Sequence, residues 1–325
     1  MTTTSDVRDL YQRLQVEFSR VIVGKSDILK LMTVALLSEG HILLEGVPGV
    51  AKTLMAKAFS QSLSFSFKRI QFTPDMLPSD VMGTFVFNAK TQEFTFRRGP
   101  IFANMILADE INRATPKTQS SLLEAMQERQ VTVEGYTEKL EEPFMVLATQ
   151  NPVELEGTYG LPESQLDRFT FRLMVDYPNH EEGVRILEYV LKGMDIPDVA
   201  KIASRGEVLD AKEFIRRSVH VEPDLLEYVV RIVEATRQED AKVSLGGSPK
   251  ASVHLLNASR ALAALEGRDY VVPDDVKQLA FPILNHRIML KPQYVSEVGA
   301  LDSPFQYKVL NQLISDLVSK IEVPR

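Results

Sequence analysis

In the stretch Gly46-Val47-Pro48-Gly49-Val50-Ala51-Lys52-Thr53, glycine, proline and small residues lead into a lysine that is followed by a hydroxyl residue. The apolar run 41–44 precedes this stretch, and apolar residues recur at helical spacing over 55–63 after it. A buried strand, a glycine-containing loop and a helix are therefore predicted in that order. The loop approximates the pattern G-x-x-x-x-G-K-[ST], in which backbone N–H groups at a helix N-terminus surround the phosphates of a nucleotide.

The chemistry of this loop assigns roles to its residues. Lys52 is expected to reach the β- and γ-phosphates of ATP, and the Thr53 hydroxyl is expected to bind Mg²⁺. Ala51 stands where glycine is usual, but alanine adds only a methyl group and tolerates a helix start, so nucleotide binding is expected to survive. A chance glycine-rich turn is the alternative, and the flanking strand and helix argue against it. The predicted nucleotide-binding residues of the loop are Gly46, Val47, Pro48, Gly49, Val50, Ala51, Lys52 and Thr53.

Two adjacent carboxylates follow a second apolar run. Residues 105–108 lead into Asp109 and Glu110, which places both side chains at the carboxyl end of a strand, where open α/β sheets bind ligands. Asp109 is predicted to hold Mg²⁺, directly or through water. Glu110 is predicted to orient and polarise the attacking water. A solvated strand end looks the same in isolation, but a phosphate-binding loop earlier in the chain favours the catalytic interpretation.

A polar amide ends the next predicted strand. In Ala148-Thr149-Gln150-Asn151-Pro152, the Asn151 amide is expected to hydrogen-bond the γ-phosphate or the attacking water. The alternative is a turn-forming Asn-Pro pair with no catalytic role. The position of the pair at the end of a strand favours the first interpretation.

Alternating strands and helices over residues 1–177 predict an α/β core with a parallel sheet and helices on both faces. Two stretches, 85–96 and 131–140, instead alternate around polar turns and are predicted to be hairpins. Residues 178–325 are predicted to form a second, all-α domain. Strands are expected at 41–44, 65–71, 104–108, 144–149 and 169–174, and helices at 8–39, 117–128, 181–193, 211–217, 223–236, 250–266, 273–285 and 304–320.

Composition excludes several classes of site. The 325 residues include 37 Lys+Arg and 44 Asp+Glu, and a net charge of −7 argues against nucleic acid as the main ligand. The absence of cysteine removes disulfides, thiolate nucleophiles and cysteine-based zinc sites. No apolar run approaches the roughly 20 residues that span a bilayer, and the first residues do not have the pattern of a signal peptide. A cytoplasmic protein without membrane insertion is expected.

Five motifs together resemble the MoxR family of AAA+ ATPases, over about residues 24–275. The resemblance implies a P-loop αβα core with two hairpin inserts, at 85–96 and 130–141, followed by a helical lid. It also implies ATP and Mg²⁺ as ligands and a homo-oligomeric ring, expected to be a hexamer. The motifs, in chain order, are GVPGVAKT (46–53), ILADEINRA (106–114), LATQNP (147–152), LPESQLDRF (161–169) and GGSPKA (246–251).

Further residue roles follow from this resemblance. Asn151 takes the sensor-1 position, and Arg168 takes the position of an arginine finger supplied to the neighbouring subunit's γ-phosphate. A structural ion pair of Arg168 with Asp167 or Glu163 is the alternative. Lys250 stands at sensor-2, where the family pattern usually has arginine, and a lysine there lacks the planar guanidinium.

Four other sites in the sequence have candidate roles. Arg260, later in the helix that follows Lys250, is an alternative sensor-2 residue. Val23-Gly24 lies where such folds place the adenine. Arg113 is a candidate for a subunit interface, and Arg97-Arg98 is either a solvated pair or a pore contact.

The function expected from the resemblance is ATP hydrolysis by a chaperone-like ring that remodels or matures partner proteins, with von Willebrand factor A-domain proteins as the expected partners. An ATPase subunit of a metal-chelatase-like complex is the alternative. A nucleic-acid motor is disfavoured by the sequence pI of 5.4 and by the lack of a basic tail.

Overall fold

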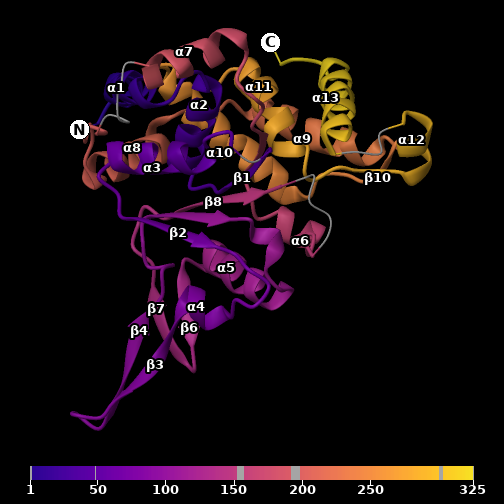
Figure 1. Cartoon of the computed structure of the whole chain (residues 1–325). Helices are drawn as coiled ribbons and strands as arrows, with labels where there is room; N and C mark the ends of the chain where they lie inside the picture. Colours follow the sequence, from indigo (N-terminus) through magenta and orange to yellow (C-terminus); the bar gives the residue numbers. More distant parts are fainter. Residues whose placement is uncertain (1, 48, 152–156, 192–197, 300–302, 325) are drawn as a thin grey trace.

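A computed structural model describes residues 2–47, 49–151, 157–191, 198–299 and 303–324 (Figure 1). Its central feature is a five-stranded, fully parallel sheet in the order β2-β5-β8-β1-β9. This confirms the predicted α/β core. The strands are β1 (Ile42–Glu45), β2 (Phe67–Gln71), β5 (Met105–Asp109), β8 (Met145–Gln150) and β9 (Phe171–Met174).

Both faces of the sheet are buried, because successive side chains of each strand point to opposite sides. Leu43, Ile106 and Val146 join the core beneath α5 (Pro116–Glu128) and the short α4 (Pro78–Met82). Their neighbours along the strands, such as Leu44 and Leu107, join a second core on the opposite face. That face is covered by α1 (Thr4–Val21), α2 (Ser26–Leu37) and α3 (Lys52–Ser62).

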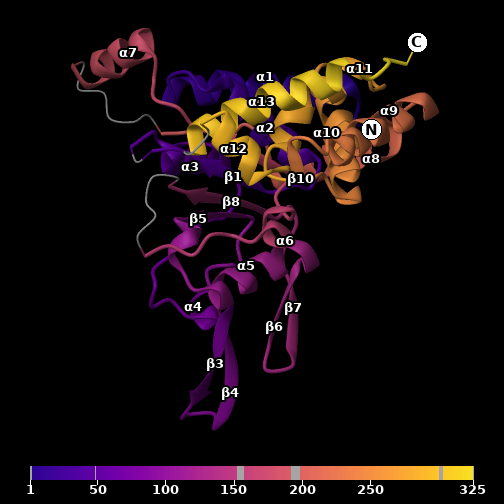
Figure 2. The same cartoon turned by 90° about the vertical axis from the view of Figure 1, so that its right-hand side faces the viewer.

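Two hairpins project from the α4–α5 side in the same direction (Figure 2). They are β3 (Gly83–Asn88) with β4 (Glu93–Arg98), and β6 (Gln130–Val133) with β7 (Tyr136–Lys139), which confirms both predicted hairpins. Phe85, Phe96 and Tyr136 join the hairpins, with ring centroids 5.4–5.9 Å apart. An ion pair between Arg98 and Glu138 adds a polar link. Arg98 therefore connects the two inserts, while Arg97 lies exposed on β4.

The second half of the chain is mainly helical, as predicted, but differs in detail. A two-stranded antiparallel ribbon, β10 (Val243–Leu245) with β11 (Met289–Leu290), was not predicted because its strands are too short to show alternation. Helix α8 begins at Arg205, before the expected 211, because Ser204 and Glu207 form a capping box. The helices are α7 (His180–Leu191), α8 (Arg205–Ser218), α9 (Pro223–Gln238), α10 (Pro249–Leu265), α11 (Pro273–Leu284), α12 (Pro292–Glu297) and α13 (Ser303–Ser319), and the core adds two short segments, the 3₁₀ turn η1 (Ile111–Arg113) and α6 (Glu163–Leu166).

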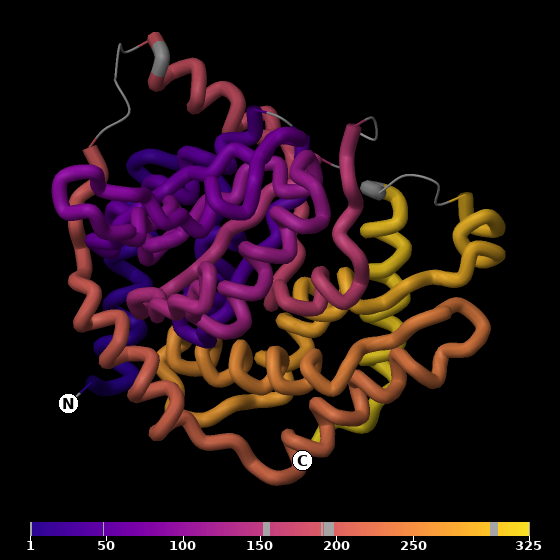
Figure 3. Tube along the Cα trace, turned by 90° about the horizontal axis from the view of Figure 1, so that it is seen from below, coloured from indigo at the N-terminus to yellow at the C-terminus, as the bar shows by residue number. Residues whose placement is uncertain are grey.

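The two halves share one hydrophobic core. Side chains of α1 and α2 and those of α8–α11 belong to the same buried cluster, and α10 packs against both α1 and α2. In Figure 3 the helices of the second half wrap around one side of the α/β core. The division at residues 177 and 178 remains a prediction, and this cluster extends across it. Among the described residues, no helix is both long and apolar enough to cross a membrane.

Helix α7 leaves an apolar face uncovered. Val184, Leu187 and Leu191 follow one another at i, i+3 and i+7 and therefore lie on one side of the helix. They are 43%, 64% and 86% exposed. Isolated exposed apolar residues are ordinary, but several on one helix face indicate a contact surface.

Buried His41, just before β1, makes the fold sensitive to acid. Its Nδ1 accepts the N–H of Val146 at 3.0 Å and its Nε2 lies 3.2 Å from the Met126 carbonyl oxygen, so a second ring proton would break the first contact. Burial lowers the pKa of His41 to about 4. Unfolded histidine binds its proton below about pH 6.5, so stability is lost as the pH falls from 6.5 to about 4.

We therefore expect unfolding free energy to fall with pH in this window, with His41 contributing about 1 kcal/mol per pH unit. Urea unfolding at several pH values measures the slope. His41→Gln should make it shallower, while His220→Gln, at an exposed histidine, should leave it unchanged. An unchanged slope in His41→Gln would refute this account of the buried ring.

Candidate nucleotide-binding site

The phosphate loop, the Asp109-Glu110 pair and Asn151 follow strands that end at one edge of the sheet, the carboxyl edge. Register pairs Glu45 of β1 with Gln150 of β8, and Gln71 of β2 with Asp109 of β5. The phosphate loop therefore starts beside β8, the strand that leads into Asn151, and near the Asp109-Glu110 pair. Asn151 itself is buried. This is the edge where parallel sheets place their ligands.

The loop after β1 requires two glycines. A Cβ on Gly46 would lie 2.4 Å from the Val175 carbonyl oxygen, so the chain can turn here only without a side chain. Gly49 has φ +84°, and nothing lies within 4 Å of where its Cβ would be. The loop thus has open space beside Gly49, two residues before Ala51, which precedes α3 (Lys52–Ser62). Pro48 lies outside the described residues.

Ala51 does not adopt the helix-start conformation that the sequence suggested. It has φ +62° and ψ +22°, the left-handed region, as the residue that precedes α3. An L-residue pays roughly 1–2 kcal/mol there, which explains why glycine is usual at this position. The substitution is tolerated sterically but carries backbone strain.

Ala51→Gly is therefore expected to preserve or raise stability, by up to about 1 kcal/mol after the entropic cost of glycine. Ala56→Gly is the matched control, because Ala56 is buried inside α3 and glycine there should cost about 1 kcal/mol. Thermal unfolding of both variants measures the difference. Equal destabilisation by the two substitutions would contradict the left-handed assignment.

Lys52 lies among three carboxylates. Its Nζ donates to the Gly46 carbonyl oxygen at 2.7 Å, which holds the ammonium over the loop. Burial lowers the pKa of Lys52, whereas the charges of Asp109, Glu110 and Glu45 raise it. A half-buried ammonium opposed by several carboxylates is a suitable partner for a polyphosphate.

Asp109 is held on both carboxylate oxygens. Thr149 Oγ1 donates to Oδ1 at 2.6 Å, and the Arg69 guanidinium lies 2.6 Å from Oδ2. The hydroxyl of Thr149 also accepts the Glu110 N–H at 2.8 Å, so one side chain of β8 orients both acidic residues. Arg69 was not among the predicted site residues.

Glu110 is restrained by two further side chains. Gln71 Nε2 donates to Oε2 at 2.8 Å, and Arg113 Nε lies 2.9 Å from the same oxygen. Arg113, a predicted candidate for a subunit interface, therefore pairs with the predicted catalytic carboxylate of its own chain. Gln71 was missed because strand periodicity alone does not reveal that β2 lies beside β5.

Arg168 lies at the opposite edge of the sheet. It precedes β9, where the Thr170 N–H donates to the His41 carbonyl oxygen just before β1. The register from Ile42/Phe171 to Glu45/Met174 then spans about 10 Å before the phosphate loop begins, at about 3.3 Å per residue. Arg168 is thus separated from its own phosphate loop by the length of the strands. Within the described chain it forms no ion pair with Asp167 or Glu163, and Asp167 pairs with Arg287 instead.

Lys250 lies close enough to Arg168 for their charges to interact. Burial lowers the pKa of Lys250, the carboxylate of Asp167 raises it, and the positive charges of Arg287 and Arg168 lower it. Arg260 is elsewhere, because its guanidinium donates to the Ile215 and Val219 carbonyl oxygens at the end of α8. The structure thus does not bring Arg260 to the nucleotide site.

The Val23-Gly24 turn borders the phosphate loop indirectly. Gly24 lies against Glu182 of α7, and the Lys25 Nζ donates to the Asp176 carbonyl oxygen at 2.9 Å. Asp176 follows Val175, the residue that packs on Gly46. The turn and the loop are therefore connected through residues 175–182, which is compatible with the expected adenine position.

Comparison with known proteins agrees with this arrangement. Residues 41–171 match the model of the ATPase family associated with various cellular activities (AAA), and residues 234–301 match an AAA lid domain. The chain is 46% identical over 287 residues to "Chaperone MoxR1" of Mycobacterium tuberculosis, covering 86% of this chain and 75% of that protein. The chain belongs to the MoxR family of AAA+ ATPases.

Two other relatives extend over nearly the whole of this MoxR-family chain. "Uncharacterized protein YeaC" of Bacillus subtilis is 45% identical over 324 residues, covering 100% of this chain and 98% of that one. The crystal structure of an ATPase candidate from Cytophaga hutchinsonii superposes with a TM-score of 0.88 at 38% identity, covering 99% and 97% of the two chains.

The residues present fit Mg²⁺-ATP. Gly46 lets the loop turn against Val175, Gly49 has open space beside it, and Lys52 supplies a cation over the loop. The Thr53 hydroxyl and the Asp109 carboxylate are oxygen donors of the type that Mg²⁺ prefers. Such an ion takes most of its other ligands from phosphate and water, so two protein oxygens are an adequate set.

Proposed function

We propose that this MoxR-family chain hydrolyses Mg²⁺-ATP in a homo-oligomeric ring, where Arg168 and Lys250 of one subunit complete the phosphate site of the next. One observation carries this proposal. The phosphate loop and Asp109-Glu110 lie at the carboxyl edge of the sheet, whereas Arg168 lies at the opposite edge. A head-to-tail contact between subunits brings these two edges together, and such contacts form a ring when the rotation between subunits closes.

In this proposal each site residue has a separate role in binding ATP or in its hydrolysis. The loop 46–53 binds the phosphates, Lys52 neutralises their charge, and Thr53 and Asp109 hold Mg²⁺, which polarises the γ-phosphate when bound. Glu110 orients the attacking water and accepts its proton, and the Asn151 amide holds the same water or the γ-phosphate. The neighbour's Arg168 stabilises charge on the departing phosphate oxygens.

The uncovered face of α7 supports the ring. Glu182 near the start of α7 contacts the Gly24 turn, and Val184, Leu187 and Leu191 are exposed further along the same helix. A neighbouring subunit that approaches the nucleotide site would cover these apolar side chains. A hexamer is the assembly that the family resemblance favours.

Remodelling of partner proteins is the proposed use of this hydrolysis. The β3–β4 hairpin carries Phe87 and Phe94 near its tip, 53% and 69% exposed, with their rings 5.3 Å apart. Exposed aromatic pairs on a projecting hairpin suit contact with a polypeptide. We propose a cytoplasmic chaperone whose partners are von Willebrand factor A-domain proteins.

The composite site predicts that ATP turnover per subunit rises with protein concentration, because only assembled subunits receive Arg168. Phosphate release measured across a dilution series, with oligomer size followed by light scattering, tests this. Lys52→Ala should be inactive at every concentration and serves as the background. Full turnover by dilute monomers would exclude the shared site.

Partner identity needs a separate measurement. The Glu110→Gln variant, loaded with Mg²⁺-ATP, should capture an A-domain protein from native lysate, and the double variant with Lys52→Ala should not. If the double variant captured the same protein as Glu110→Gln, binding would not depend on ATP and nucleotide-gated binding would be contradicted.

A further inference from the structure

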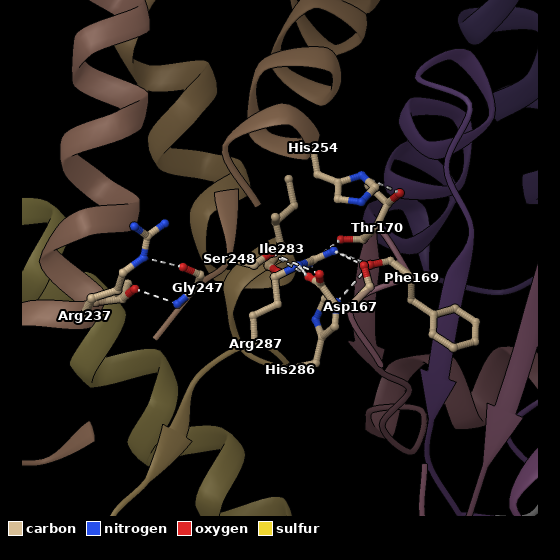
Figure 4. A network of polar contacts seen from close by, with 11 residues as sticks. Asp167, Phe169, Thr170, Arg237, Gly247, Ser248, His254, Ile283, His286 and Arg287 are labelled. Atoms are coloured by element: carbon tan, nitrogen blue, oxygen red, sulfur yellow. Dashed lines mark hydrogen bonds and ion pairs between the residues drawn. The ribbon is translucent and has the colours of Figure 1, made fainter. Parts of the chain in front are cut away.

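Arg287, in the loop between α11 and β11, is almost completely enclosed. Its side chain is 1% exposed, and its Nε donates to Asp167 Oδ1 at 2.8 Å. The other nitrogens donate to backbone carbonyl oxygens just before β9, with Phe169 at 2.6 Å, Asp167 at 3.2 Å and Thr170 at 3.3 Å. Figure 4 shows the guanidinium directed from the lid into this turn of the core.

These contacts hold both sides of the residue that the proposed function places in the neighbouring site. Arg287 binds Asp167 and Phe169, the two residues that flank Arg168 in the chain. The backbone of Arg168 is therefore fixed on each side, while its own side chain stays half-buried at the surface. A finger must present its guanidinium within hydrogen-bond reach, and a misplacement of about 1 Å can cost 10²-fold in rate.

The same network reaches Lys250. Ser248 Oγ donates to Asp167 Oδ2 at 3.0 Å, and Ser248 precedes α10, whose first turn carries Lys250. The Gly247 N–H donates to Thr236 Oγ1 at 2.9 Å, and Arg237 Nε donates to the Gly247 carbonyl oxygen at 2.7 Å, so the turn is tied to α9 as well. Asp167 thus connects the turn before β9 with the Gly247-Ser248 turn before α10 (Figure 4).

We propose that Arg287 is a positioning residue for ATP hydrolysis in the neighbouring subunit: through Asp167 and the Phe169 carbonyl it fixes Arg168 and Lys250 in one rigid arrangement. This inference rests on the proposed composite site. Burial lowers the pKa of Arg287 to about 10, which leaves the group charged at neutral pH beside Asp167. Lysine cannot replace it. The planar guanidinium donates to the Asp167 carboxylate and to several carbonyl oxygens at once, whereas a single ammonium cannot reach all of these acceptors.

Arg287→Lys is the test variant, since it keeps the charge and removes the fork. We expect kcat to fall by about ten- to hundredfold while the KM for ATP and the binding of a fluorescent ATP analogue stay unchanged, because the variant's own phosphate loop is intact. Asp167→Asn should reproduce the defect. Thermal unfolding and light scattering establish that each variant is folded and assembled.

Arg260→Lys is the matched control. Arg260 is a partly buried lid arginine that also donates to backbone carbonyl oxygens, but at the end of α8. The same chemical change there should leave turnover within about twofold of the wild type. An equal loss in this variant would mean that any disturbance of the lid lowers activity, and would overturn a specific role for Arg287.

Mixing subunits separates positioning from a general structural role. Lys52→Ala subunits are inactive but carry an intact Arg168, so adding them to Arg287→Lys subunits should restore turnover at the variant's phosphate loops. Adding Arg168→Ala subunits should restore nothing. Wild-type turnover by Arg287→Lys alone, or no restoration by Lys52→Ala, would overturn the inference.

The proposed function has its own control in the same experiment. If Lys52→Ala and Arg168→Ala complement each other while Arg287→Lys behaves like the wild type, the shared site stands and only the inference falls. If Lys52→Ala and Arg168→Ala do not complement each other, the shared site itself is wrong.

Discussion

Glu110→Gln should abolish ATP turnover, with a loss of about 10²–10⁴-fold, while ATP binding persists. The carboxylate lies at the end of β5, fixed by Gln71 at 2.8 Å and Arg113 at 2.9 Å, and its backbone N–H is held by Thr149. An amide of the same size keeps the shape of the site but cannot accept a proton from water. Phosphate release gives the rate, and equilibrium dialysis with ATP gives the affinity.

Glu124→Gln is the matched control for this variant, because Glu124 is exposed on α5. It should retain wild-type turnover. Hydrolysis at the wild-type rate in Glu110→Gln would remove Glu110 from the catalytic role. A loss of ATP affinity equal to the loss of rate would instead make Glu110 a binding residue.

Arg168→Ala should lower turnover by about 10³–10⁵-fold, the range for a guanidinium that stabilises charge in phosphoryl transfer. The expected loss is confined to kcat, because the phosphate loop that binds ATP lies at the other edge of the same subunit's sheet. Steady-state kinetics and ATP binding measure the two parameters separately.

The control is Arg231→Ala, at an exposed arginine on α9 that pairs with Glu227 one turn away. It should leave turnover and assembly unchanged. If Arg168→Ala weakened ATP binding to isolated subunits, Arg168 would act within its own chain, contrary to the position of the residue at the far edge of the sheet.

Much of the fold could be predicted because individual strands, loops and helices leave their patterns within short stretches of sequence. The apolar run before Gly46, the glycine loop and the helix after it lie within about 20 residues, and the structure has a strand, a loop and a helix there. The two hairpins were visible as alternation around polar turns. The alternation of strands and helices along residues 1–177 also predicted a parallel sheet with helices on both faces.

Contacts between distant segments were not visible in the sequence. Arg69 and Gln71 meet Asp109 and Glu110 only because β2 pairs with β5, and no periodicity specifies which strands are neighbours. Arg287 meets Asp167 from the lid, across the boundary between the predicted domains. The strain at Ala51 was likewise missed, because residue type alone does not give a backbone angle.

The most direct test of the shared site is a mixture of two inactive variants. Lys52→Ala subunits carry an intact Arg168, and Arg168→Ala subunits carry an intact phosphate loop, so a mixed ring contains complete sites. We predict that ATP turnover appears on mixing and reaches a maximum at an intermediate ratio. Two variants that stay inactive at every ratio, while co-assembling by size, would contradict catalysis shared between subunits.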